Sequence, residues 1–383
     1  MTVSGWEWVL AATSALVVAL FLMLLVWQSV RISHLKTRVA ELRHRIEVGA
    51  ALAAHPKRPE ERLVGVVVNV TKDSADHVVQ LIRTACADAG MPEPLIMDTT
   101  AEDPGHEMSR RALDAGCDVV IAAGGDGTVR AVATEVSGAP VALGVVPLGT
   151  GNLFARNIGL PHHNLESCVS EALHGTPHGV DTVNLTLERA GGRTQQEVSL
   201  VIAGGGLDAQ VMADTGDELK QRAGWLAYGA AGLRHVTGPR KTVTVELDDR
   251  GPANFRVRSV LLANCGILQA GMVLVPSARF DDGHMDTVLF TPRHALDWAR
   301  IIAKTTLRFT ADIPVMTVRQ AKVGRISMAE PMQFQIDGDA VGEVVSVRAV
   351  VDPAALSVNG VVTEVLAGTA GAVSDRAANR PTS

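Results

Sequence analysis

The sequence lacks an excess of positive charge, because 35 lysines and arginines stand against 41 aspartates and glutamates, for a net charge of −6. Proteins that bind nucleic acid rely on a basic surface for much of their affinity, so nucleic acid is not an expected partner. Cysteine is scarce as well, and the 4 cysteines form no CxxC pair. This spacing argues against a zinc site or a disulfide framework and predicts reduced cysteines in the core.

Several familiar motifs are also absent. The chain has no GxxxxGK(S/T) sequence, which excludes a Walker-type phosphate loop. No GxGxxG with a downstream acid opens the first strand–helix unit, which argues against a Rossmann dinucleotide site. The histidines show no metal-ligand spacing, and no nucleophile elbow supports Ser/His/Asp chemistry.

One long hydrophobic run is present near the N-terminus. Residues 8–27 carry no charge and match the roughly 20 residues that a helix needs to cross a bilayer. Tryptophans lie at both ends, and no basic residue precedes the run, which argues against a cleaved signal peptide. Because basic residues follow it, the positive-inside rule predicts a single-pass anchor in the cell membrane, residues 1–30, with the rest of the chain in the cytoplasm.

Residues 31–61 are predicted to form a juxtamembrane helix and a linker. An apolar stripe with steps of three and four runs through this helix, at Ile32, Leu35, Val39, Leu42 and Ile46. Two interpretations are equally open. The stripe is typical of a short coiled coil, which predicts a possible homodimer, and the basic residues beside it are typical of a helix that touches anionic lipid.

The remaining chain is long enough for two globular domains, and its first part, residues 62–160, alternates apolar strands with amphipathic helices. The predicted strands are 63–70, 95–97, 118–123 and 141–146, and the predicted helices are 74–89, 106–115, 128–137 and 153–158. Continuous apolar strands in this order predict a parallel sheet with helices on both faces. We therefore expect a three-layer α/β nucleotide-binding domain, with its ligand at the carboxyl ends of the strands.

Two glycine-rich loops follow successive strands of this domain. The first is Gly124-Gly125-Asp126-Gly127-Thr128, and the second contains Thr150 and Asn152. Glycines let the backbone turn tightly and approach an anion, while the N–H groups at the start of the next helix face it. Either loop alone is often only a tight turn. Two in succession, one of them with an aspartate, favour a polyphosphate site.

Short β-rich segments bounded by turns dominate after residue 179. They are 181–188, 197–204, 241–249, 255–265, 286–291 and 322–328. This pattern predicts a mostly β, sandwich-like second domain over residues 161–340. Residues 367–383 have the composition of a flexible tail.

Acidic turns in this second domain are candidates for phosphoryl-transfer chemistry, which needs a base for the hydroxyl proton. Asp337 and Asp339 flank a glycine after a predicted strand, and such a pair can have one pKa raised. The segment 280–286 is a second acidic turn, and its oxygens suit Mg²⁺. Taken alone, the turn with Asp337 and Asp339 is equally typical of an ordinary solvated loop, and the segment 280–286 is more typical of an ordinary Asp-Gly hairpin than of a metal site.

Together, GGDGTVRAVA (124–133) and VVPLGTGNLFARNIGLP (145–161) resemble the diacylglycerol kinase catalytic-domain family of bacterial lipid kinases. That family is related to sphingosine and ceramide kinases and more distantly to NAD kinases, and the resemblance covers roughly residues 62–365. It implies a mostly β second domain, an active site between the domains, and a C-terminal segment, 341–366, that returns to the first domain. The cofactors implied are ATP and Mg²⁺.

The resemblance also implies roles for individual residues. The family's general base is assigned to an Asp-Gly-Glu sequence, which corresponds to Asp337 and Asp339, with aspartate in the place of the glutamate. A matching turn of the family holds a structural Mg²⁺ through one aspartate and two backbone carbonyls, which correspond to Asp282, Arg279 and His284. The residues implied to bind ATP are Asn69, Thr100 or its neighbour Thr99, Gly124, Gly125, Asp126, Gly127, Thr128, Thr150 and Asn152.

The sequence departs from the family pattern at two places. The residues after Asn69 do not form the NPxSG-like turn that the family shows, and Leu153 stands where the family's G-T-x-N-D motif has an aspartate. The leading hypothesis is an ATP-dependent lipid kinase that acts on a membrane lipid. The alternatives are a kinase for a soluble substrate, similar to NAD kinase, and a membrane-bound lipid sensor or scaffold with lapsed catalysis.

Overall fold

The computed structural model describes residues 57–206, 240–268, 272–306 and 313–362. The predicted membrane anchor, the predicted juxtamembrane helix over 32–46 and the predicted tail lie outside these residues. Among the described residues, no helix has both the length and the apolar character that a membrane span requires. The four cysteines are buried and unpaired, as predicted.

A parallel sheet forms the centre of the first domain. Its strands are β1 (Val64–Val68), β2 (Leu95–Asp98), β3 (Val119–Gly124) and β4 (Ala142–Pro147). They lie side by side in the order β4-β3-β1-β2. All residues of β1, β3 and β4 are buried, and strands of this kind need cover on both faces of the sheet.

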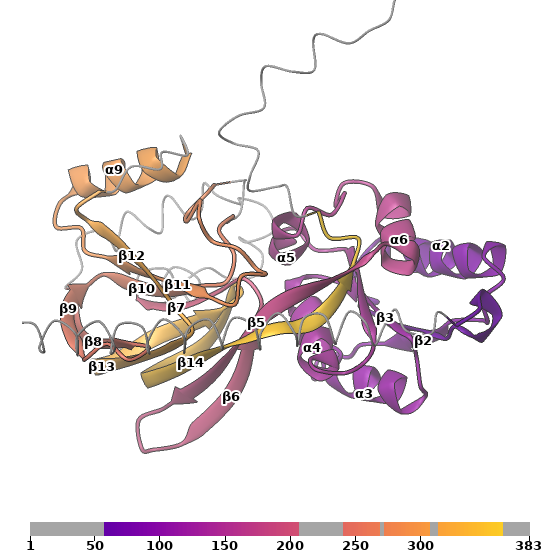
Figure 1. Ribbon diagram of the computed structural model, residues 1–383, viewed down its shortest axis with the longest axis horizontal. Coiled ribbons are helices and arrows are strands. Elements are labelled where there is room, and N and C mark those ends of the chain that lie inside the picture. Colours follow the sequence, from indigo (N-terminus) through magenta and orange to yellow (C-terminus); the bar gives the residue numbers. More distant parts are fainter. Residues whose placement is uncertain (1–56, 207–239, 269–271, 307–312, 363–383) are drawn as a thin grey trace, which may run out of the picture. The chain divides into compact units, whose positions relative to one another are not determined.

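Helices provide this cover, so the first domain has three layers (Figure 1). The helices are α2 (Ala75–Asp88), α3 (His106–Asp114), α4 (Asp126–Val136), α5 (Leu153–Asn157) and α6 (Leu165–His174). Successive strand residues point to opposite faces. Accordingly α3 and α4 share a core cluster with Val67 and Val120, whereas α2 and α6 share one with Val66 and Ile121.

The strands and helices predicted for residues 62–160 are confirmed, with one shift that matters for the site. The predicted helix 128–137 begins earlier, at Asp126, because Gly125 is its N-cap. The last part of the glycine-rich turn therefore already belongs to the first turn of α4. Helix α6 has no counterpart among the predicted elements.

The second domain is built mainly from antiparallel strands. They are β5 (Pro177–Glu188), β6 (Thr194–Ser199), β7 (Ile202–Gly206), β8 (Lys241–Leu247), β9 (Ala253–Val257), β10 (Ser259–Ala263), β11 (Met285–Phe290), β12 (Met316–Ala321), β13 (Val323–Ile336) and β14 (Asp339–Asn359). One helix, α9 (Ala295–Thr306), follows β11. A separate apolar core cluster lies among these strands.

Two segments predicted as single strands are broken. Residues 197–204 divide into β6 and β7 at Leu200 and Val201, and residues 255–265 divide into β9 and β10 at Arg258. Periodicity could not reveal the first break, because Leu200 and Val201 are apolar and buried, as residues within a strand would be. Their backbone N–H groups are instead bonded to an aspartate far along the chain, as described below.

Strand β14 connects the two domains through main-chain pairing. Its first half pairs with β13, and near its end Ser357 and Val358 pair in parallel with β4. A two-residue turn, Asp337 (φ 50°) and Gly338 (φ 98°), joins β13 to β14. Positive φ at both positions suits a tight hairpin. This turn is the D-G-D sequence of the candidate site.

Candidate active site

The loops that carry the predicted nucleotide-binding residues lie side by side at the carboxyl ends of the parallel strands. Backbone hydrogen bonds join each loop to the next strand: Thr99 N–H donates to Val68 O (2.9 Å), Asn69 N–H to Ala123 O (2.9 Å) and Leu148 N–H to Gly124 O (2.8 Å). The structure thus brings together the residues that the sequence places after β1, β2, β3 and β4.

One glycine of each loop permits a close approach. A Cβ atom on Gly124 would lie 2.6 Å from Thr128 Oγ1, and one on Gly149 would lie 2.9 Å from Gly125 Cα. The two glycine-rich loops therefore pack backbone against backbone. Because Gly125 at the N-cap of α4 has no side chain, it cannot cap the first turn of the helix. The N–H groups at such a helix start are suited to bind an anion.

Asp126 ties the first loop to the second. Its Oδ1 accepts a hydrogen bond from Leu153 N–H (2.7 Å), at the start of α5. Burial, and next the nearby charge of Asp337, raise the pKa of Asp126 to about 6 against the lowering effect of this bond. Leu153, which replaces the expected aspartate, has a buried side chain, so its backbone rather than its side chain takes part in the site.

The second loop is shaped by Asn152. This residue adopts a left-handed conformation (φ 47°), its Oδ1 accepts from Gly149 N–H (3.0 Å) and its Nδ2 donates to Gly149 O (2.7 Å). Its amide thus holds the loop closed. Thr150, at the tip of the same loop, is exposed.

Two further predicted nucleotide contacts also have local partners. Asn69 Oδ1 accepts from Thr71 N–H (3.1 Å) and from Thr71 Oγ1 (2.7 Å), which closes a turn after β1. Thr100 Oγ1 accepts from Asp103 N–H (3.1 Å). Thr100 is exposed whereas Thr99 is buried, so of these two threonines Thr100 is the one that a ligand can reach.

The two acids of the D-G-D turn have different surroundings. Asp337 is 6% exposed. Its Oδ1 accepts hydrogen bonds from Ser199 Oγ (2.8 Å), Val201 N–H (2.9 Å) and Ile202 N–H (2.9 Å), and its Oδ2 accepts one from Leu200 N–H (2.9 Å). Three of these donors bind Oδ1 and one binds Oδ2, so both oxygens of the buried Asp337 carboxylate are engaged by the protein itself.

Asp339 lies on the other side of the turn and reaches the first domain. Its side chain is 55% exposed, and its Oδ2 lies 2.9 Å from Nη2 of Arg130 on α4. A Cβ atom on Gly127 would lie 3.6 Å from the same oxygen. The structure thus places a carboxylate from the second domain directly beside the glycine-rich turn of the first.

The acidic turn before β11 is separate from these loops in sequence but firmly held. Asp181 Oδ2 accepts from Gly283 N–H (2.6 Å), and Asp181 Oδ1 accepts from Ala354 N–H (2.7 Å). Within the turn, Asp282 Oδ1 accepts from His284 N–H (3.0 Å), and His284 Nδ1 lies 2.8 Å from Asp282 O. Burial raises the pKa of Asp282.

The surroundings of the Asp286 carboxylate show whether this turn suits the implied Mg²⁺. Its Oδ1 is buried and has no hydrogen-bond partner within the described part of the chain. Burial, and next the charge of Asp282, raise the pKa of Asp286 to about 6. A buried carboxylate with an unpaired oxygen, beside the half-buried carboxylate of Asp282, fits a hard cation, which prefers oxygen ligands and would offset both charges. The predicted ligands, Asp282 with the carbonyls of Arg279 and His284, belong to this same turn.

The neighbouring Asp281 is already neutralised. Burial alone would raise its pKa, but hydrogen bonds from His178 Nε2 (3.1 Å) and Arg279 Nε (3.0 Å) outweigh burial and lower the pKa to about 2. Asp281 is thus paired with the Arg279 guanidinium and hydrogen-bonded to His178, in contrast to Asp282 and Asp286. The sequence Asp281-Asp282 gave no sign of this difference.

Residues that the sequence analysis missed include Arg130, Asp181 and the Ser199–Ile202 segment. Arg130 lies within the motif GGDGTVRAVA, so its position two residues after Thr128 could have drawn attention to it. Asp181 and Ser199–Ile202 carry no comparable signal. Their partners, Gly283 and Asp337, lie more than a hundred positions away and can be found only from the fold.

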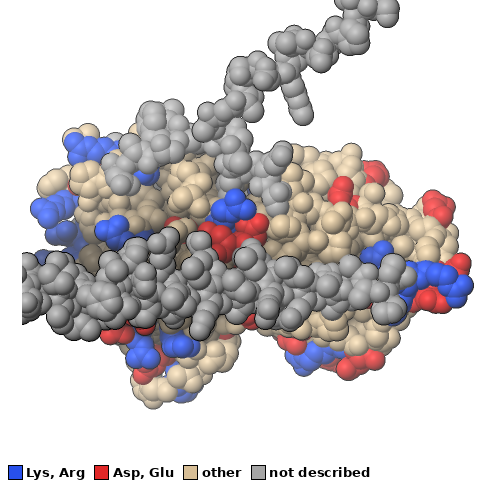
Figure 2. Space-filling view, viewed as in Figure 1, with Lys and Arg blue, Asp and Glu red and all other residues tan. Residues whose placement is uncertain are grey.

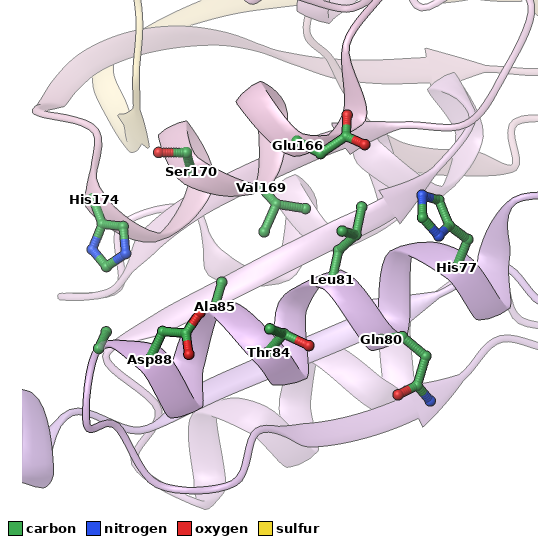
Figure 3. Close-up of a pocket in the computed structure, with 11 residues that line it drawn as sticks. His77, Gln80, Leu81, Thr84, Ala85, Asp88, Glu166, Val169, Ser170 and His174 are labelled. Atoms are coloured by element: carbon green, nitrogen blue, oxygen red, sulfur yellow. The ribbon is translucent and has the colours of Figure 1, made fainter.

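A groove of about 600 Å³ lies between helices α2 and α6 (Figure 3). It is lined by His77 and Leu81 on one helix and Glu166 and His174 on the other, among others. None of its lining residues belongs to the predicted site, which is formed by loops at the strand ends.

In the space-filling view, acidic and basic side chains lie beside one another on the face shown (Figure 2).

Comparisons with known proteins agree with this architecture. The family described as "Diacylglycerol kinase catalytic domain" matches residues 64–185. The family described as "YegS C-terminal NAD kinase beta sandwich-like domain" matches residues 201–360. The chain is thus an α/β domain followed by a β-sandwich-like domain, and both are of kinase type.

Individual relatives give the same result. A diacylglycerol kinase of Bacillus subtilis is 27% identical over 69% of this chain and 84% of its own length. One of Staphylococcus aureus is 26% identical over 71% of this chain and 82% of its own length. A crystal structure of a putative diacylglycerol kinase from Bacillus anthracis aligns with a TM-score of 0.61 at 19% identity, over 79% of this chain and 96% of that one. Residues 64–185 thus match the diacylglycerol kinase catalytic-domain family, and the chain is a homologue of diacylglycerol kinases at 27% identity.

Proposed function

We propose that the protein is a lipid kinase that transfers the γ-phosphoryl group of ATP to a hydroxyl group of a membrane lipid. The observation that carries this proposal is the position of Asp339, whose Oδ2 would lie 3.6 Å from a Cβ atom on Gly127 of the phosphate-binding turn. A base for the acceptor hydroxyl must lie beside the phosphates. The family match and the diacylglycerol kinase names of the relatives support a lipid acceptor.

Each part of the site has a distinct task in this proposal. The uncapped start of α4 and the packed glycine loops bind the polyphosphate, because their N–H groups face an anion at close range. Asp339 accepts the proton of the lipid hydroxyl while the hydroxyl oxygen bonds to the γ-phosphorus and the β–γ bridging bond breaks. The departing ADP keeps the electron pair of that bond.

Asp339 is preferred over Asp337 as this base for a geometric reason. The carboxylate of Asp337 already accepts four hydrogen bonds from Ser199 and the three residues after it. The side chain of Asp339 is more than half exposed, so a substrate hydroxyl can approach it. Asp337 then has a structural task, since it fixes the turn that presents Asp339.

Mg²⁺ is part of the same proposal. The acidic turn would hold one ion through Asp282 and the carbonyls of Arg279 and His284, where the ion would offset the charges of the half-buried Asp282 and the buried Asp286. When bound beside ATP, a Mg²⁺ ion offsets negative charge on the phosphates. Asp126 lies at the phosphate-binding turn with a raised pKa, so its charge is sensitive to such a cation.

The predicted anchor over residues 8–27 also belongs to this proposal. A single-pass helix in the cell membrane would keep a cytoplasmic active site next to a substrate that stays in the bilayer. Self-association through residues 32–46 is a further proposal. A monomer of the full-length chain in detergent, measured by light scattering, would count against that association.

The test uses the full-length protein in mixed micelles with γ-labelled ATP, Mg²⁺ and a panel of lipids that contains diacylglycerol, phosphatidylglycerol, glycolipids and sphingoid bases. We expect one lipid class to be labelled, and Asp339→Asn to lower kcat at least about 100-fold. Asp249→Asn is the matched control, because Asp249 is an exposed aspartate of the turn between β8 and β9. Absence of label in every lipid would instead favour a sensor or scaffold with lapsed catalysis.

A further inference from the structure

Arg130 connects the phosphate-binding turn to the second domain. It lies in the second turn of α4, and its side chain is only 17% exposed. Its Nη2 donates to Asp339 Oδ2 at 2.9 Å, and its Nη1 lies 3.5 Å from Ile336 O. One guanidinium therefore contacts both strand ends of the hairpin turn, on either side of Asp337 and Gly338.

The chemistry of arginine makes this contact directional. A guanidinium is planar and permanently charged, and its donors have a fixed fork geometry, so it orients a carboxylate as well as attracting it. Because most of the Arg130 side chain is buried against the protein, the fork does not rotate freely as a surface arginine would. The Asp339 side chain itself remains more than half exposed.

A second observation shows that the contact is made at the functional turn. Gly127 has no side chain, and a Cβ atom there would lie 3.6 Å from Asp339 Oδ2. Arg130 follows Gly127 by three positions, so both lie on one face of α4. The guanidinium holds the carboxylate over the first turn of the helix, where the phosphates are proposed to bind.

We propose that Arg130 is a positioning residue that holds the Asp339 carboxylate at the phosphate-binding turn and keeps it ionised for proton transfer. This inference rests on the proposed function, in which Asp339 is the proton acceptor. Arg130 does not touch the reacting atoms in this scheme. Its effect passes through Asp339, which distinguishes it from a salt bridge that only joins the two domains.

The first experiment compares the pH dependence of kcat/KM for the wild type, Arg130→Met and Arg130→Lys. An opposite charge within hydrogen-bond distance lowers the pKa of a carboxyl group. Loss of the charge in Arg130→Met is therefore expected to move the acid limb of the profile up by about half to one pH unit. Arg130→Lys keeps the charge but not the fork, so its acid limb stays near that of the wild type while kcat falls.

The control variant is Arg110→Met. Arg110 lies on α3 of the same domain, and its Nε donates to Glu135 Oε2 at 2.9 Å, so this change also removes an arginine–carboxylate pair. We expect its profile to match the wild type. An acid limb that stays in place in Arg130→Met, whether or not kcat falls by a constant factor, would overturn the proposal.

A second experiment does not depend on activity. The full-length chain in detergent is treated with a carbodiimide and glycinamide, and labelling of Asp339 is followed by mass spectrometry. Without the guanidinium, Asp339 is more exposed and more readily protonated, so we expect labelling at least about threefold faster in Arg130→Met than in the wild type or Arg110→Met.

The two experiments distinguish a failure of the proposed lipid kinase function from a failure of the proposed role of Arg130. A wild type that labels no lipid counts against the proposed function, and the labelling rates then decide whether Arg130 controls Asp339. Equal labelling rates in all three proteins would overturn the inference even if the wild type proves to be an active lipid kinase.

Discussion

Replacement of Asp337 by asparagine separates the structural acid of the D-G-D turn from the proposed catalytic one. Asp337 is 6% exposed, and its carboxylate accepts hydrogen bonds from Ser199 Oγ and from the N–H groups of Leu200, Val201 and Ile202. These donors come from the break between β6 and β7. We expect Asp337→Asn to destabilise the second domain, whereas Asp339→Asn removes activity and leaves the fold intact.

The expected loss of stability in Asp337→Asn follows from the hydrogen bonds that the four donors now make to the carboxylate. An asparagine can place its oxygen where Oδ1 now meets Ser199, Val201 and Ile202, but its Nδ2 then faces the N–H of Leu200. A buried donor without an acceptor costs about 1–3 kcal/mol, and hydrogen bonds to a neutral oxygen are weaker than those to a charged one by about half. The cheaper burial of a neutral amide offsets part of this. We expect a net loss of about 2–4 kcal/mol.

The assay is thermal unfolding of the full-length chain, followed by circular dichroism. A loss of 2–4 kcal/mol is expected to lower the Tm of a domain of this size by roughly 4–16 °C. Asp339→Asn breaks a half-exposed ion pair with Arg130, and such pairs contribute at most about 1 kcal/mol. Its Tm is therefore expected to stay within about 4 °C of the wild type.

Two results would refute this division of roles. If Asp337→Asn melts with the wild type yet loses activity, then the four hydrogen bonds on Asp337 do not stabilise the fold as described. If Asp339→Asn lowers the Tm as much as Asp337→Asn, the contact with Arg130 stabilises the fold more than an exposed ion pair is expected to.

Three further predictions concern the charges and the anchor. Burial raises the pKa of Asp126 from 3.8 to about 6, so ionisation of this residue opposes folding. The resulting loss in the free energy of unfolding grows as the pH rises from about 4 to about 6 and is constant at higher pH. In chemical denaturation, Asp126→Asn should therefore be more stable than the wild type by about 1–3 kcal/mol at about pH 8 and equally stable near pH 4. Its kinase activity is expected to fall. If the variant and the wild type were equally stable at both pH values, the prediction would be contradicted. A chelator should lower the Tm of the wild type by a few degrees but leave Asp282→Asn unchanged, and an equal effect on both would place Mg²⁺ elsewhere. Deletion of residues 1–30 should move the protein out of the membrane fraction and reduce phosphorylation of lipid in vesicles more than in micelles; a truncated protein that still sediments with membranes would speak against the anchor.

The strand and helix order of the first domain could be predicted because local signals decide it. Val64–Val68 and Val119–Gly124 are continuous apolar runs, and glycine or a polar N-cap stands where each following helix begins. The two glycine-rich loops were likewise visible, and the parallel topology places them side by side at the same edge of the sheet. Local sequence was sufficient wherever the partner of a residue lies in the neighbouring element.

Long-range contacts could not be predicted in the same way. The segment 197–204 has the composition of a single strand, and it divides where Asp337 accepts hydrogen bonds from the N–H groups of Leu200, Val201 and Ile202. In the same way, Asp181 gives no sign in the sequence that it holds the turn at Gly283. Hydrogen bonds between distant segments depend on the fold as a whole, and one sequence contains no periodic signal for them.

The choice between Asp337 and Asp339 depends on one such contact. Both residues are aspartates in a tight turn, and the sequence left the identity of the base open between them. The hairpin geometry turns Asp337 into the second domain, where four donors bind it, and brings Asp339 to Gly127 and Arg130 on α4. An aspartate is one methylene shorter than the glutamate that the family resemblance implies, so in the proposed mechanism its backbone has to lie closer to the phosphates than that of a glutamate would. Gly127 leaves that space, because any side chain there would project towards the Asp339 carboxylate.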